Sequence, residues 1–181
     1  MQIRQLALHY VREADRLLWR INTSDGQLIA IWLTRRLTLR LWPHLTQMIT
    51  QLAVRRQLPQ SNPAATLLPE ARDMLNEAAR ESALRKADFK TPFDSQPRAL
   101  PLGDEPMLAV QVRLVPLPEG LLRLQVTDTS GRNVQLQLSD ELAIAVQELL
   151  VRALTEADWG WSPAAAPAAG HEEPGTPRTL N

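Results

Sequence analysis

The residues with the clearest capacity for binding chemistry are three arginines near the start of a predicted helix. Arg35, Arg36 and Arg40 follow Thr34, where a strand pattern changes to a helical one. Positive charge at a helix N-terminus opposes the helix dipole, so two arginines there lower stability unless an acid offsets them. Such a helix end can bind a phosphate or a carboxylate. The alternative is that the arginines pair with acids of the same chain or are simply hydrated.

A second candidate surface lies on one face of the strands that precede this helix. One set of alternating side chains suits a core, whereas the opposite set includes Arg20, Leu28 and Trp32. A tryptophan among aliphatic residues is more apolar area than a protein usually leaves in water, so we expect something to cover it. The cover is either the middle helix of this chain or a partner surface. The predicted binding residues are therefore Arg20, Leu28, Trp32, Arg35, Arg36 and Arg40.

Patterns associated with catalysis or cofactor binding are absent from the sequence. There are no cysteines, which excludes disulfides, thiolate metal sites and a cysteine nucleophile. The three histidines, His9, His44 and His171, lack the spacing of metal ligands, and the seven glycines form no phosphate-binding loop. The acidic pair Asp104 and Glu105 lies in a proline-rich stretch, where hydration explains it. We expect a protein that is not an enzyme and that binds neither a cofactor nor a metal.

Composition places the chain among ordinary globular proteins. Its 181 residues are 44% hydrophobic and 22% charged, which suits one domain or two small modules that share a core. No apolar run approaches the roughly 20 residues of a transmembrane helix, and the first residues lack a signal-peptide pattern. Together with the lack of cysteine, these features predict a cytoplasmic protein without a membrane partner.

The elements that position the candidate residues occur twice in the chain. Residues 16–45 align without a gap on residues 121–150 when Gly26 is laid on Gly131. Few of the aligned pairs are identical, but nearly all core-type positions keep their size and polarity. Self-similarity of this kind is the mark of a repeated structural unit. The sequence therefore predicts an α+β fold made by tandem duplication, with one additional helix between the copies.

Each copy is predicted to contain three antiparallel strands followed by a helix. Alternating apolar side chains indicate the strands, and a glycine turn joins the second strand to the third. Thr34 and Ser139 can cap the helices by accepting a hydrogen bond from a backbone N–H. Pro43 lies inside the first helix and predicts either a kink or two shorter helices.

Domain boundaries follow from the repeat and from local composition. We predict a first module over residues 1–57 and a second over residues 107–158. Between them lies a proline-containing linker, 58–106, with one helix at about 69–87 that starts at a proline. Residues 159–181 contain few large apolar side chains, so we predict a disordered tail.

Charge separates the two modules, although the whole chain is neutral. Residues 1–57 hold nine arginines against three acids, a net charge of +6. Residues 101–160 hold four arginines against nine acids, a net charge of −5. The basic half can therefore attract acidic groups of the other module or of a partner.

These observations favour a binding or scaffolding protein that acts through protein–protein contacts, as an oligomer or with another protein. The alternative is a single-stranded nucleic-acid-binding protein. Antiparallel strands followed by a capped helix, joined at Leu138 and Ser139, resemble in outline the single-strand-binding transcription coactivator and whirly proteins. Arginines together with Tyr10, Trp19 and Trp32 could then track phosphates and stack on bases. Against this alternative, the basic half has no lysine and Trp19 aligns with a core leucine.

Overall fold

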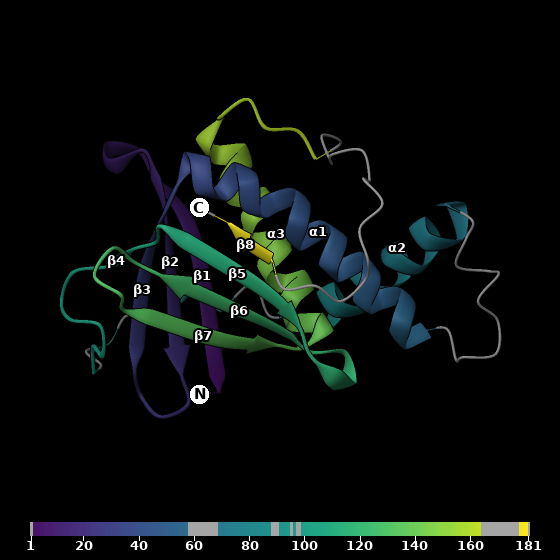
Figure 1. The fold of residues 1–181 in the computed structure, drawn as a ribbon, viewed down its shortest axis with the longest axis horizontal. Coiled ribbons are helices and arrows are strands. Elements are labelled where there is room, and N and C mark those ends of the chain that lie inside the picture. The colour runs from purple at the N-terminus through teal and green to yellow at the C-terminus, as the bar shows by residue number, and fades with distance from the viewer. Residues whose placement is uncertain are drawn as a thin grey trace.

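The computed structural model describes residues 2–57, 69–87, 91–94, 96, 99–163 and 178–180. These residues form an α+β fold with two four-stranded sheets and three α-helices (Figure 1). The first sheet has the order β1 (Ile3–Val11), β2 (Arg16–Thr23), β3 (Leu28–Thr34) and β4 (Met107–Leu108). The second has the order β7 (Asn133–Leu138), β6 (Leu122–Thr127), β5 (Gln111–Pro116) and β8 (Arg178–Leu180). The helices are α1 (Arg35–Gln57), α2 (Pro69–Lys86) and α3 (Asp140–Ala157).

The duplication predicted from the sequence is present in the structure. The units β1-β2-β3-α1 and β5-β6-β7-α3 have the same order and the same antiparallel neighbours. Their hairpin turns also match: Gly26 N donates to Thr23 O at 3.2 Å, and Gly131 N donates to Asp128 O at 3.3 Å. Both glycines have positive φ, 77° and 84°, which a residue without Cβ adopts at no steric cost. The two turns therefore set the same register in both copies.

Helices α1 and α3 both begin directly after the predicted capping residue. Thr34 accepts a hydrogen bond from Leu37 N at 3.3 Å, and Ser139 accepts one from Leu142 N at 3.2 Å. Each bond satisfies one of the N–H groups that the first helical turn leaves without a partner. Helix α1 continues past Pro43 as one element, so the alternative of two shorter helices does not occur. Packing along the helix outweighs the single hydrogen bond that the proline removes.

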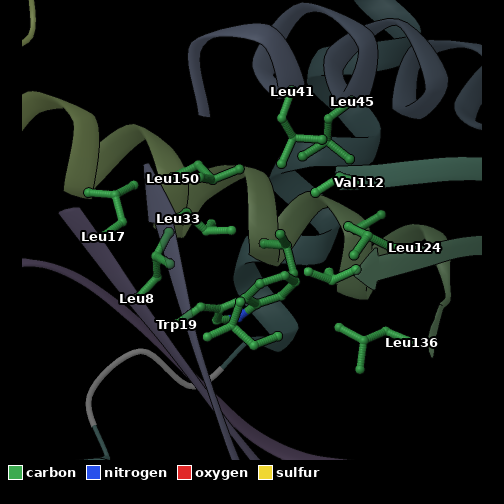
Figure 2. Close-up of a cluster of buried hydrophobic side chains, with 14 of the residues drawn as sticks. Leu8, Leu17, Trp19, Leu33, Leu41, Leu45, Val112, Leu124, Leu136 and Leu150 are labelled. Atoms are coloured by element: carbon green, nitrogen blue, oxygen red, sulfur yellow. The ribbon is translucent and has the colours of Figure 1, made fainter. Parts of the chain in front are cut away.

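Both modules contribute to one hydrophobic core. The side chains that the alternation predicts to face inward are buried in β2, β3, β6 and β7. In the first strand of each predicted unit the prediction is only partly right, because Leu6, Tyr10 and Val110 are half-buried, and Leu108 is exposed on β4, which joins the first sheet. In Figure 2, side chains from both sheets and both long helices gather around one interior region; they include Leu8, Trp19, Leu33, Leu41, Leu45, Val112, Leu124, Leu136 and Leu150. The predicted modules are therefore repeats that share an interior.

Helices α1 and α3 pack across the boundary between the repeats. Helix α1 lies alongside β5, and α3 lies alongside β1, so each helix contacts the first strand of the other unit. Helix α2 is the predicted middle helix, and it packs on α1 and α3. Arg80 of α2 bonds to Glu148 of α3 at 3.0 Å, and Lys86 bonds to Glu141 at 2.7 Å. Helix α2 thus bridges the other helices, and Figure 1 shows it at the end of the molecule away from β3.

The C-terminal part differs from the predicted disordered tail. Trp159 is 5% exposed and belongs to the core, and Trp161 packs edge-to-face on Trp42 with ring centroids 4.8 Å apart. The last strand, β8, pairs with the open edge of β5. Two large aromatic side chains bury enough apolar area to order the segment after α3, which an average over the whole tail does not reveal. The remainder of the predicted tail lies outside the described residues.

Replacement of Leu45 or Leu150 by alanine tests whether the repeats share one core. The two residues occupy matching positions in α1 and α3 and are 0% and 2% exposed. Each change should lower the free energy of unfolding by about 3 kcal/mol. Each should also shift one common transition, measured by chemical denaturation with tryptophan fluorescence and circular dichroism. Gln135→Ala, on the exposed side of β7, is the control and should change stability by less than about 0.5 kcal/mol. Two separate transitions would contradict the shared core.

Candidate functional site

An apolar row crosses the outer face of the first sheet. His9 of β1 lies opposite Leu18 of β2, Leu18 lies opposite Trp32 of β3, and Trp32 lies beside Leu108 of β4. Residues in register on neighbouring strands point to the same face, so these four side chains form one continuous row, called here the outer row. All four keep part of their surface exposed, and Leu108 reaches 36%.

The second sheet provides an internal comparison for the outer row. The matching positions of the second unit are Val115, Arg123 and Gln137, which lie in register across β5, β6 and β7. An arginine therefore replaces Leu18, and a glutamine replaces Trp32. Because the same backbone arrangement forms with polar residues in this row, the fold does not require an apolar row in the first sheet.

Within the described residues, a loop of the same chain covers only the neighbouring end of this face. The guanidinium carbon of Arg20 lies 4.6 Å from the ring centroid of Phe93. Asn22, which lies opposite Leu28, is 0% exposed and donates to Asp94 O at 2.9 Å. Part of the outer face, at Arg20 and Asn22, is therefore covered by the same chain, as one alternative predicted. The covering segment is the loop that contains Phe93 and Asp94, not the middle helix. Trp32 is only partly buried by the described residues.

The predicted arginine group at the start of α1 divides into residues with different roles. Arg35 Nη2 donates to Trp159 O at 3.0 Å and so connects the start of α1 to the segment that follows α3. Arg36 is exposed and makes no hydrogen bond or ion pair with another residue in the described part of the chain. Arg40 is exposed and has an interaction partner. Arg35 therefore helps to hold two helix ends together, whereas Arg36 remains a candidate for an external partner.

An acid of the first module offsets part of this positive charge. Asp15 accepts hydrogen bonds from Trp159 Nε1 at 2.7 Å and from Tyr10 Oη at 2.9 Å. These two bonds, with a smaller contribution from the charge of Arg35, hold the pKa of Asp15 below its ordinary value. The rings of Tyr10 and Trp159 meet edge-to-face at 5.7 Å. Sequence reasoning missed this group because Asp15 and Trp159 are 144 positions apart.

Chemical groups typical of a metal site are not brought together in the described residues. Among them, no three histidine, aspartate or glutamate side chains are placed to hold a metal ion. Within the same residues, no helix combines the length and the apolar character needed to cross a membrane.

Comparison with known proteins gives no relative from which a function could be transferred. No protein-family model matches the chain, and no curated protein or solved structure is significantly similar to it. The surfaces of the molecule and the differences between its two repeats are therefore what indicates its function.

Arg35→Gln and Arg36→Gln form a matched pair that tests the division of the arginines. Both changes remove one positive charge from the first turn of α1, so both gain equally from relief of the dipole. Only Arg35→Gln also loses the bond to Trp159, so it should be less stable than Arg36→Gln by about 1 kcal/mol. Thermal and chemical denaturation of both variants measures the difference. Equal stability would show that the Arg35 bond contributes nothing.

Asp15 should also make the protein sensitive to acid. Since its pKa is lower in the folded state than the ordinary 3.8, its contribution to stability is complete above that value. The stabilising contribution of Asp15 is lost as the pH falls from 3.8 through the lower pKa of the folded state. Asp15→Asn, whose side-chain oxygen can still accept from Trp159, should flatten the loss of stability in this acidic range. Denaturation midpoints across a pH series measure it, and an unchanged slope in Asp15→Asn would refute this role.

Proposed function

We propose that the protein is a non-catalytic binding protein that docks a protein partner on the outer row of the first sheet. The observation that carries the proposal is the exchange of Arg123 and Gln137 for Leu18 and Trp32 at matching positions of two similar sheets. Partly exposed apolar side chains that folding does not require are typical of a contact surface. Trp32 at the centre of the row is the residue type that most often dominates such contacts.

The partner that we propose is a second copy of the chain, which makes the protein an oligomer. Two copies related by a twofold axis can bury the outer rows against each other, because an isologous contact uses the same patch on both sides. His9 is compatible with an apolar contact because the pKa of its imidazole is lowered. Burial lowers this pKa most and the charge of Arg20 lowers it further, whereas the charge of Glu156 raises it by a smaller amount. A lowered pKa keeps His9 uncharged at neutral pH.

Substitution of the outer row by the residues of the second sheet tests this function. Leu18→Arg and Trp32→Gln introduce side chains that the second sheet carries at matching positions, so we expect both variants to fold. Sedimentation velocity of the wild type should show a mass that rises with concentration, and each substitution should weaken association about tenfold or more. Gln135→Ala serves as the control. A wild type that stays monomeric at the highest attainable concentration would refute the proposed self-association.

Single-stranded nucleic acid is the second candidate partner. The observation that favours it is the exposed Arg36, four residues from the partly exposed Trp32. Two of the aromatic residues predicted to stack on bases are engaged elsewhere, since Trp19 is 2% exposed in the core and Tyr10 packs on Trp159. Titration with a labelled oligonucleotide at increasing salt separates the candidates, because counterion release makes nucleic-acid binding fall steeply with salt. Lack of binding at low salt removes this candidate.

A further inference from the structure

The C-terminal strand shows what the open edge of the repeated unit can bind. Strand β8 lies antiparallel to β5, with Leu180, Thr179 and Arg178 opposite Val112, Arg113 and Leu114. Helix α1 contacts both β5 and β8, so the added strand lies where this helix runs beside the sheet (Figure 1). The first strand of the second unit therefore accepts an additional strand on the edge that faces away from β6.

Strand β1 occupies the same place in the first unit. Its register with β2 matches that of β5 with β6, so Leu6, Ala7 and Leu8 correspond to Val112, Arg113 and Leu114. Helix α3 lies alongside β1 just as α1 lies alongside β5. Among the described residues, however, β1 pairs only with β2, and no strand pairs with its outer edge.

A groove of about 680 Å³ runs along this open edge of β1. One wall is α3, and a second is formed by residues 91–93. The lining includes the three β1 residues that correspond to the β8-binding residues of β5. The first unit thus has a groove at the position where the second unit holds a strand.

The backbone of β1 is oriented to bind a strand in this groove. The backbone N–H of Leu28 donates to Ala99 O and therefore points away from β2. Leu28 and Asn22 are thus a pair without hydrogen bonds between them, so the N–H and C=O groups of Asn22 point toward β1. The partner of Asn22 on β1 is Gln5, whose backbone groups point back toward β2. Ala7 lies two residues further along β1, so its N–H and C=O groups point toward β2 as well. Because successive residues of a strand alternate, the N–H and C=O groups of Leu6 and Leu8 point toward the open edge.

The charge of the groove favours an acidic occupant. Arg4 and Arg152 line it and are exposed, and no aspartate or glutamate is among the described residues of its lining. Arg152 Nε bonds to Glu148 at 3.2 Å, and the Arg152 side chain remains exposed. Apolar side chains of α3, such as Leu142 and Leu149, line the same groove. A segment with alternating apolar and acidic residues matches this surface.

We propose that the groove between β1 and α3 binds an extended acidic segment of a partner protein, as a strand antiparallel to β1 and opposite Leu6, Ala7 and Leu8. Main-chain hydrogen bonds to the open edge supply affinity, and the alternate side chains supply selectivity. His9 borders both surfaces, but Leu6 and Leu8 at the open edge are separate from Leu18, Trp32 and Leu108 of the outer row. This binding mode therefore goes beyond the proposed function, and Trp32→Gln tests the two separately.

A capped, fluorescent hexapeptide of alternating valine and glutamate is the probe for this site. Titrated into the full-length protein, it should bind by fluorescence anisotropy, and a valine–lysine peptide should bind about tenfold more weakly or worse. A valine–glutamate peptide that is N-methylated at every residue has no N–H group to donate to β1 and should not bind. Equal binding of the valine–glutamate and valine–lysine peptides would overturn the proposal, as would binding of the N-methylated peptide.

Two substitutions on α3 locate the binding site. Ala145→Trp places a large side chain in the groove, whereas Thr155→Trp adds the same side chain at an exposed position outside it. The first should abolish peptide binding, and the second should leave it unchanged. Trp32→Gln on the outer row should also leave peptide binding unchanged, which separates failure of this inference from failure of the proposed function. Full binding by a folded Ala145→Trp variant would overturn the inference.

Amide hydrogen exchange of the unmodified protein gives a test that needs no variant. The amides of Leu6 and Leu8 should become protected when the valine–glutamate peptide binds, because their N–H groups then donate to its backbone. Binding of the peptide without protection at these amides would overturn the proposed geometry. Protection that rises with protein concentration in the absence of peptide would identify a second copy as the occupant and overturn the proposed acidic partner.

Discussion

The constraint on which the rest of the structure depends is that neither repeat can bury its own apolar face alone. A three-stranded unit and one helix do not close around an interior, so each sheet needs surface from the other half of the chain. The exchange of helices meets this need: α3 contacts β1, and α1 contacts β5. One core then contains the inner faces of both sheets. The repeats keep their inward residues alike because both copies contribute to the same interior.

Surfaces that do not contribute to this interior were free to diverge. On the outer faces, Leu18 and Trp32 stand where the second unit has Arg123 and Gln137. At the sheet edges, β5 is covered by β8, whereas β1 borders a groove. In both cases the second copy forms the same fold without the apolar outer row and without the open groove that the first copy has. The differences between the repeats are therefore better evidence of function than either repeat alone.

The helix ends show how a local irregularity can have a long-range explanation. Arg35 at the start of α1 opposes the helix dipole, whereas the second unit begins its helix with acids. In the folded protein Arg35 donates to the carbonyl of Trp159, whose indole N–H in turn donates to Asp15. The arginine thus joins both helices and the β1–β2 connection. Arg36 has no such role among the described residues, so the two neighbouring arginines differ in their structural roles.

The sequence by itself determined the features that depend on nearby residues. Alternation specified the inward faces of β2, β3, β6 and β7, Gly26 and Gly131 specified the turns, and Thr34 and Ser139 specified the helix starts. Each of these signals acts within a few positions of the chain. Only the tertiary structure decided which helix covers which sheet, that β8 joins β5, and that Trp159 orders the segment after α3. It also decided that a loop, and not α2, covers Arg20. These contacts join residues far apart in the sequence, and their energies depend on shapes that exist only after the two repeats have packed together.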